Sequence, residues 1–377
     1  MVLGCASGAA PDSSGPPGAP LAGLSPAEQE RFAAGRAIFQ REFTPEEGLG
    51  PLFNEKRCSS CHDLPTAGGN GVERVTKATR FEAGQCDLLR DEGGDNVQRH
   101  ATPLLEAAGV AHEEVPKRAT AVAQIVPPAL YGLGLLEAIP DDEILALESG
   151  QRRRSDGVTG RAARTVDGRI GRFGRKAQFA TIRDFIDEAI RTELGLTTPR
   201  HPAEETVNGR PLPAGTDPAA DPEVDEATLA ALESYVRLLA PPAREIAAGA
   251  LRDTLARGER IFREIGCAAC HVATMTAGAV AGATGNHRVI HAYTDLLLHD
   301  MGPELASICS ETAGPGVWRT TPLMGLRFRQ TYLHDGRALR IDGAIQLHGG
   351  EAARARRAWE ALPPRRRDLV VRFVHSL

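Results

Sequence analysis

Two Cys-x-x-Cys-His pentapeptides constrain this 377-residue chain more than any other feature. They are Cys58-Ser59-Ser60-Cys61-His62 and Cys267-Ala268-Ala269-Cys270-His271. In each, the two thiols can add across the vinyl groups of a haem, and the adjacent histidine lies where its imidazole can bind the iron. The pattern therefore predicts two covalently attached c-type haems, with His62 and His271 as their proximal ligands.

Two other kinds of site also use paired cysteines. Four thiolates could bind zinc, but a zinc site does not need a histidine after each pair, and the pairs are 209 residues apart. A thioredoxin-like redox site needs a βαβ context, which neither pair has. The sequence pattern therefore favours haem.

A short pattern recurs before each pentapeptide. It reads Gly35-Arg36-Ala37-Ile38-Phe39 in the first copy and Gly258-Glu259-Arg260-Ile261-Phe262 in the second. The glycine precedes the first cysteine by 23 residues in one copy and by 9 in the other, so the first copy carries an insertion of 14. We expect a leading cytochrome c helix used twice, in two modules.

The length suggests two domains. Pro241-Pro242 marks their boundary, which gives haem domains at 24–240 and 241–377 after a tether at 1–23. Helical patterns cover about 25–43, 140–149, 181–194, 225–239, 243–265 and 365–377. Glycines and charges dominate 64–115, which indicates long loops around a haem, and no alternating apolar run indicates a substantial sheet. The expected fold is all-α with extensive loops, in two cytochrome c-like domains.

Several features bear on location and partners. Attachment of haem to thiols occurs outside the cytoplasm, so we expect a periplasmic or outer-surface protein in which Cys86 and Cys309 can form a disulfide. Residues 2–7 resemble the end of a lipoprotein signal with Cys5 as the lipid-bearing residue, although a tail with an incidental cysteine is the alternative. No stretch is apolar enough to span a membrane. The net charge of −5 gives no sign of nucleic-acid binding.

Five further segments resemble the di-haem oxidoreductase family, whose members are also described as peroxidases or thiol oxidoreductases. The segments are 43–54, 131–141, 171–174, 293–302 and 333–337. The resemblance extends from about residue 25 to the end and implies a branch of the superfamily of bacterial di-haem cytochrome c peroxidases and MauG. It also implies that the N-terminal haem reacts with peroxide and that the C-terminal haem receives and stores electrons.

The resemblance implies a distal ligand for the second haem, fourteen residues after the histidine of a Tyr-x-His-Asp-Gly stretch. Here that histidine is His334 and the ligand is His348, so this iron is expected to be bis-histidine and lower in potential than a His/Met haem. The alternative is that His348 is a surface residue. Met301 could also bind haem in principle, while His299 is expected to order a loop or bind a propionate.

The first haem has no ligand where the resemblance implies one, because that position holds Ala78. His100 and His112 are the nearest candidates. Otherwise the sixth position of this iron is open, as peroxide binding requires.

Peroxide cleavage needs a group that takes a proton from one peroxide oxygen and delivers it to the other. Glu137 lies in an apolar segment where desolvation would raise its pKa, so it is the candidate for this group; the alternative is that its carboxylate faces solvent.

Trp318 is a candidate for passing electrons between haems, or else a core residue. Arg175 departs from the family pattern, which has an aromatic there. The reduced acidic segment at Asp156-Gly157 leaves a calcium ion between the haems unsupported.

These features predict a di-haem oxidoreductase that reduces hydrogen peroxide with electrons from a small cytochrome c or cupredoxin. A MauG-like oxidation of a protein or organic substrate is the second hypothesis. The third is electron transfer alone, with both irons six-coordinate. Fold resemblance cannot choose among them.

Overall fold

The structure is a computed structural model that describes residues 14–245, 248–281 and 288–377. Cys5, the residue expected to carry a lipid, lies outside the described residues. The α-helices are α1 (Pro26–Gln40), α2 (Cys58–Cys61), α3 (Pro103–Ala107), α4 (Leu133–Glu137), α5 (Asp141–Arg152), α6 (Ile182–Ala189), α7 (Glu226–Leu238), α8 (Gly249–Glu264), α9 (Ile341–Gln346), α10 (Ala353–Glu360) and α11 (Pro364–His375). The short 3-10 and π segments are η1 (Pro45–Glu47), η2 (Arg90–Glu92), η3 (Ile190–Leu194), η4 (Cys267–Ala269), η5 (Pro303–Leu305), η6 (Leu326–Phe328) and η7 (Gly350–Ala352).

Small antiparallel sheets accompany these helices. The strands are β1 (Leu52–Phe53), β2 (Val75–Glu82), β3 (Gln85–Asp87), β4 (Asn96–Val97), β5 (His100–Ala101), β6 (Ala121–Ile125), β7 (Ala163–Arg164), β8 (Ile170–Gly171), β9 (Met275–Ala277), β10 (Arg288–Ile290), β11 (Leu298–Asp300) and β12 (Val317–Arg319). The longest strand, β2, pairs with β3, β4 and β6.

The expectation of an all-α fold is wrong. The chain is about 36% helix and 15% strand, which makes it a mixed α/β protein. The error lies mainly in the segment 64–115, which was expected to form loops and contains β2; this strand pairs with β6, just beyond the segment, in a register that joins Val75 to Ile125. Both strands contain alanines and charged or polar residues, and they pair across more than forty residues, so local patterning did not reveal them.

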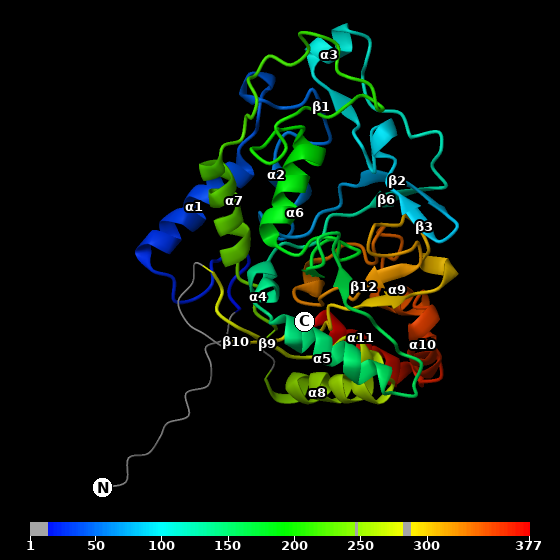
Figure 1. Cartoon of the computed structure of the whole chain (residues 1–377). Coiled ribbons are helices and arrows are strands. Elements are labelled where there is room, and N and C mark those ends of the chain that lie inside the picture. Colours follow the sequence, from blue (N-terminus) through cyan, green and yellow to red (C-terminus); the bar gives the residue numbers. More distant parts are fainter. Residues whose placement is uncertain (1–13, 246–247, 282–287) are drawn as a thin grey trace.

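Two helix pairs explain the recurring Gly-x-x-Ile-Phe pattern. Helix α1 packs against α7, and α8 packs against α11 (Figure 1). A Cβ atom at Gly35 would lie 2.0 Å from the carbonyl oxygen of Ala231, and one at Gly258 would lie 2.2 Å from that of Leu369. Each glycine therefore permits a close helix crossing that no larger residue allows.

The phenylalanine of the pattern lies beside the histidine of the following pentapeptide. The rings of Phe39 and His62 are 6.2 Å apart at an interplanar angle of 53°. Those of Phe262 and His271 are 6.3 Å apart at 53°. The two copies therefore place the same side chain against their histidines in the same way, as expected for a module used twice.

The two modules interlock. Helix α5 precedes the expected boundary at 240, yet the Nε2 atom of Gln151 donates hydrogen bonds to Asp295 and to the carbonyl of Ala269. Arg161 forms a β-bridge with Leu298. The segment expected to be a tether also joins the body, because Gly15 bridges Pro242 and Leu21 is 2% exposed. Among the described residues, no helix has the length and apolar character needed to cross a bilayer.

Candidate active site

The first cavity lies at the first pentapeptide. It has a volume of about 270 Å³, and Cys58, Cys61 and His62 line it together with Phe39. Apolar side chains from α6, η3, α7 and β6 complete much of its wall, among them Ile186, Ile190, Leu232, Val236 and Ile125. Two thiols, an imidazole and an apolar wall at one cavity fit a covalently held haem.

The second cavity lies at the second pentapeptide. It has a volume of about 570 Å³, and Cys267, Cys270 and His271 line it together with Phe262. His348 lines the same cavity. The four cysteines do not meet at one site, so the zinc arrangement considered from the sequence has no geometric support.

Backbone carbonyls orient the imidazoles at these cavities. The Nδ1 atom lies 3.3 Å from the carbonyl of Gly69 for His62, and 2.9 Å from that of Tyr293 for His271. Nδ1 of His348 lies 2.7 Å from the carbonyl of Ala344. A donor at Nδ1 leaves Nε2 with the lone pair that binds a metal. Burial lowers the pKa of His62 and of His271 to about 4, so both imidazoles are neutral at pH 7.

The cysteines fall into two classes. The four cysteines of the pentapeptides are free thiols, whereas Cys86 and Cys309 form a disulfide. Burial raises the pKa of Cys58 and of Cys267 to about 12, which keeps these thiols protonated at neutral pH. The disulfide prediction is confirmed, and the attachment cysteines stay available for a haem.

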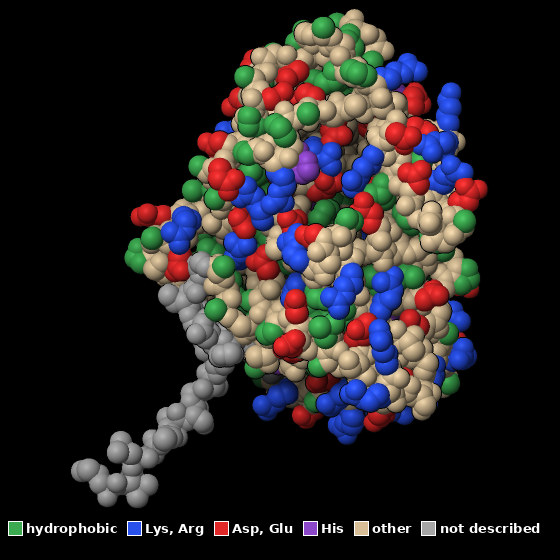
Figure 2. All heavy atoms as spheres, in the orientation of Figure 1, with side chains coloured by type: hydrophobic (Ala, Val, Ile, Leu, Met, Phe, Trp, Pro, Cys, Tyr) green, Lys and Arg blue, Asp and Glu red, His purple; other side chains and the backbone are tan. Residues whose placement is uncertain are grey.

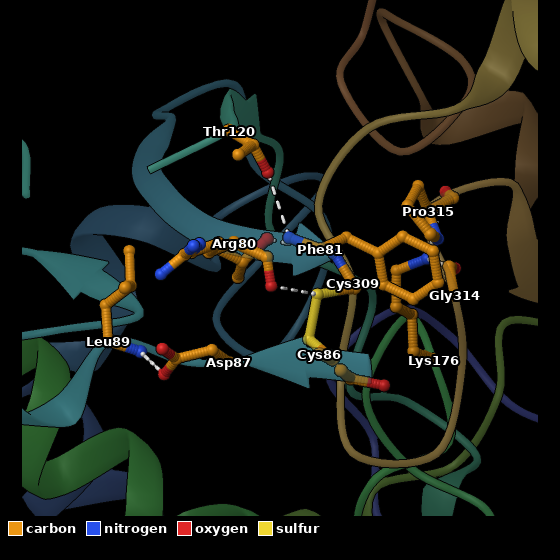
Figure 3. The surroundings of a disulfide bond; sticks show 12 residues. Arg80, Phe81, Cys86, Asp87, Leu89, Thr120, Lys176, Cys309, Gly314 and Pro315 are labelled. Carbon is orange, nitrogen blue, oxygen red and sulfur yellow. Dashed lines mark hydrogen bonds between the residues drawn. A yellow bond between two sulfur atoms is a disulfide. The ribbon is translucent and has the colours of Figure 1, made fainter. Parts of the chain in front are cut away.

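The disulfide joins the two modules at the wall of the first cavity. Cys86 lies on β3, and Cys309 lies in a loop of the second module that lines this cavity (Figure 3). In the same region Nζ of Lys176 donates to the carbonyls of Gly314 and Pro315 at 2.9 and 3.3 Å. Together these bonds hold the loop of the second module against the first cavity.

The two cavities differ in their histidines. The second cavity is lined by His271, His348, His299 and His334, together with Met301. Within the described part of the chain, the first cavity is lined by His62 and by no other histidine or methionine. His100 and His112, the candidates from the sequence, are both exposed. The structure therefore offers a second imidazole at one cavity and none at the other.

The structure does not bring Glu137 to either cavity. Its carboxylate accepts a hydrogen bond from the backbone N–H of Ile182 at 2.8 Å and pairs with Nε of Arg237 at 2.7 Å. Glu137 therefore caps α6 and ties it to α7. The sequence suggested an apolar environment for Glu137, but its carboxylate has these two polar partners. We therefore do not retain Glu137 as the acid/base.

A different carboxylate, Glu193, lines the first cavity. Its oxygens accept hydrogen bonds from Nδ2 of Asn54 at 2.8 Å and from Nδ2 of Asn96 at 3.1 Å. Burial raises the pKa of Glu193, which favours its protonated form. Lys77 lines the same cavity and pairs with Asp95 at 3.5 Å. Glu193 was missed in the sequence, although it falls three residues after Ile190 and so on the apolar face of its helix.

Four residues form the wall between the cavities. Arg175 lines both cavities, Lys176 lines the first, and Trp318 and His334 line the second. Nζ of Lys176 lies 3.6 Å from the centre of the Trp318 ring. The rings of His334 and Trp318 are stacked, with ring centres 3.8 Å apart at 18°. A continuous contact therefore joins the two cavities through Trp318.

His299 has a structural role at the second cavity. Its Nε2 lies 2.9 Å from Asp295 and its Nδ1 lies 2.8 Å from Glu351. Although burial alone would lower it, hydrogen bonds to Asp295, Cys270 and Glu351 raise the pKa of His299 to about 12. A protonated imidazole has no lone pair with which to bind a metal. The contacts of His299 with Asp295 and Glu351 instead order the loop, which is one of the two roles expected from the sequence.

Charged side chains of both signs are interspersed over the face seen in Figure 2.

Four carboxylates lie close together away from the cavities, at Glu204, Asp217, Asp221 and Glu223. None of these four lines either cavity.

Comparison with known proteins identifies the family. Residues 121–377 match the family described as "Di-haem oxidoreductase, putative peroxidase". Among solved structures, hydrazine synthase of Kuenenia stuttgartiensis is 14% identical, covering 100% of this chain and 99% of that chain with a TM-score of 0.46. A MauG-like protein associated with microbial copper homeostasis is 15% identical, covering 97% and 93% with a TM-score of 0.42. No curated protein matches the chain. The match over two thirds of its length shows that the chain belongs to the di-haem oxidoreductase family and is a haem-dependent oxidoreductase.

Proposed function

We propose that each cavity holds one covalently attached c-type haem. Cys58 and Cys61 would form the thioethers at the first cavity, and Cys267 and Cys270 those at the second. His62 and His271 would be the proximal ligands. The support is the repeated arrangement of two free thiols and one neutral imidazole beside a phenylalanine ring. When bound, the haems supply one-electron redox chemistry at iron.

We further propose that the protein reduces hydrogen peroxide at the first cavity, with electrons that enter at the second. The observation that carries this proposal is the difference between the cavities. His348 faces the second cavity and can complete a six-coordinate iron, whereas His62 has no counterpart among the residues that line the first. A small oxidant needs an open coordination position, and a bis-histidine haem suits electron storage.

The side chains of the first cavity have roles in proton handling. Burial raises the pKa of the Glu193 carboxyl, which brings proton uptake at this group closer to neutral pH. It can therefore exchange a proton with a peroxide oxygen as general acid and base. Nζ of Lys77, held by Asp95, is a cationic hydrogen-bond donor at the same cavity and can orient a polar oxidant there.

The expected surroundings and partner remain part of the proposal. The disulfide between Cys86 and Cys309 suits an oxidising compartment such as the periplasm or the outer surface. The electron donor would be a small cytochrome c or cupredoxin, which delivers one electron at a time.

The test is the spin state of each haem in the purified protein. Electron paramagnetic resonance and visible spectra of the oxidised and half-reduced forms should show one high-spin haem that binds cyanide and reacts with peroxide. The other haem should stay low-spin. Two low-spin haems in every redox state would overturn the peroxidase proposal and favour electron transfer alone. If peroxide oxidises the protein but an added reduced cytochrome is not consumed, the oxidation of another substrate would replace peroxide reduction.

A further inference from the structure

Three arginines at the second cavity lack carboxylate partners. Arg175, Arg319 and Arg329 all line this cavity, and Arg175 also lines the first. The guanidinium of Arg175 donates to the carbonyl of Val126 at 2.8 Å, and that of Arg319 donates to the carbonyl of Gly174 at 3.1 Å. Among the residues that the structure describes, none of the three has an acidic group within ion-pair distance.

The nearest acidic groups already have other partners. Asp295 accepts hydrogen bonds from Gln151 and His299, and Asp335 pairs with Arg337. By contrast Arg172, three residues before Arg175 and 7% exposed, pairs with Asp141 at 2.6 Å. The chain therefore pairs one buried arginine of this segment and leaves the next one unpaired.

An unpaired cation cluster away from bulk solvent is unfavourable unless an anion joins it. Burial lowers the pKa of all three arginines, to about 10 for Arg319, and the charge of neighbouring arginines lowers the pKa of Arg175 and Arg319 further. At neutral pH Arg319 is still charged, so deprotonation does not relieve the repulsion. The cluster requires negative charge from outside the polypeptide.

One buried donor of this cluster makes no hydrogen bond. Nε of Arg175 is buried and has no hydrogen-bond partner within the described structure. Nε2 of His334, which lines the second cavity, also makes no hydrogen bond, and Asp335 lies 3.8 Å from it. The N–H of Arg175 adds a directed donor to the positive charge, and a planar guanidinium matches a carboxylate with two parallel hydrogen bonds.

We propose that Arg175, Arg319 and Arg329 bind propionate carboxylates of the haems, with Arg175 serving the cofactors of both cavities. This inference rests on the proposal that each cavity holds a haem, since every haem carries two propionates. It explains why an arginine replaces the aromatic expected at position 175. A free oxyanion is the other source of the same ligand chemistry.

The test compares midpoint potentials in spectroelectrochemical titrations. Positive charge beside a haem favours its reduced form, so Arg175→Leu should lower both midpoint potentials, while Arg175→Lys should restore most of each loss. Arg329→Leu should lower the potential of the second haem. Arg31→Leu is the control, because Arg31 is exposed on α1 and lines neither cavity, so both potentials should match the wild type.

Haem content is measured first, by mass and by the pyridine haemochrome spectrum. This measurement tests the proposal of one haem in each cavity independently of the propionate site. Fewer than two haems would refute the haem assignment itself. With two haems present, unchanged potentials in both Arg175→Leu and Arg329→Leu would overturn the propionate site. A shift at one haem in Arg175→Leu would overturn the shared role. A wild-type potential that moves on addition of inorganic phosphate would show a free-anion site instead.

Discussion

At the scale of single residues, the partners of two glutamates distinguish the proposed acid/base from a residue with a structural role. Glu193 lines the first cavity with a raised pKa, whereas Glu137 pairs with Arg237 outside it. Glu193→Gln should lower peroxide turnover by roughly 10²–10⁴-fold, the usual contribution of a positioned acid/base, and leave both haems bound. Steady-state assays with a reduced cytochrome as donor provide the measurement.

Glu137→Gln is the matched control for this prediction. It loses an ion pair and keeps an acceptor for the N–H of Ile182, so we expect a lower unfolding midpoint with turnover within a few-fold of the wild type. The reverse pattern, with turnover lost in Glu137→Gln and kept in Glu193→Gln, would restore the sequence-based assignment.

The second haem gives a prediction about its ligand. His348→Met should raise one midpoint potential, because a His/Met haem lies higher than a bis-histidine haem within the roughly 0.8 V that axial ligands cover. Potentiometric titration of both haems measures the shift. His100→Met is the control, since His100 is exposed and pairs only with the ring of Phe53 among its ring contacts. An unchanged potential in His348→Met would refute this ligand.

Sequence patterns pointed to residues that are related by local spacing. Each Cys-x-x-Cys-His unit is contiguous, and the family resemblance pointed to His348, fourteen residues after His334; both histidines line the second cavity. Glu193 was missed because its partners Asn54 and Asn96 lie about 139 and 97 positions away along the chain. Its raised pKa depends on burial that only the folded chain creates.

At the scale of elements, the helix crossings depend on glycine. Gly35→Ala should destabilise the protein by about 1–3 kcal/mol, because the new methyl group would meet the backbone of α7. Gly150→Ala, in α5, is the matched control, since a Cβ there has nothing within 4 Å. That change should stabilise by about 0.5–1 kcal/mol through helix propensity alone. Denaturant titrations followed by circular dichroism distinguish the two signs, and equal effects would contradict the close crossing.

The loop that follows η3 gives a prediction about pH. Burial and the neighbouring carboxylates Glu223, Asp217 and Asp221 raise the pKa of Glu204 to about 9, from an ordinary 4.5. Between these values the folded chain holds a proton that the unfolded chain releases, so this group lowers stability as pH rises through the window. Glu204→Gln should therefore stabilise the protein at pH 7 by on the order of 1–2 kcal/mol after solvent screening, and have little effect near pH 4.

Unfolding midpoints measured at both pH values in the presence of a chelator test this prediction. The exposed Glu30→Gln provides the comparison, and it should change stability little at either pH. A Glu204→Gln variant that is equally stabilised at pH 4 and pH 7 would rule out the repulsion among carboxylates.

Helices were easier to predict than strands for a physical reason. Helix α1 carries its own start signal, a capping box between Ser25 and Glu28, and the helices expected near 140, 225 and 365 are all present. A helix closes its hydrogen bonds within the segment. Strand β2 closes its bonds with β6, a partner 46 residues away whose sequence has no matching signal.

At the scale of the whole molecule, the second module contributes to the cavity of the first. The loop that contains Cys309 lines the first cavity, and the disulfide fixes it to β3 across a separation of 223 residues. A cross-link between distant positions restricts the unfolded chain, so replacing both cysteines with serine should cost about 2–5 kcal/mol. Thermal and denaturant unfolding measure the loss, with dithiothreitol-treated wild type as a second route to the same state.

The loss of this cross-link should affect the two cavities unequally. Cys309 lines the first cavity and not the second, so the variant should alter the cyanide affinity of the haem proposed there and leave the midpoint potential of the haem proposed at the second cavity unchanged. A Cys86→Ser, Cys309→Ser protein with wild-type stability would show that the other contacts between modules, such as Lys176 with Gly314, hold the loop unaided. An equal change at both proposed haems would show that the cross-link supports the overall fold and has no local role at the first cavity.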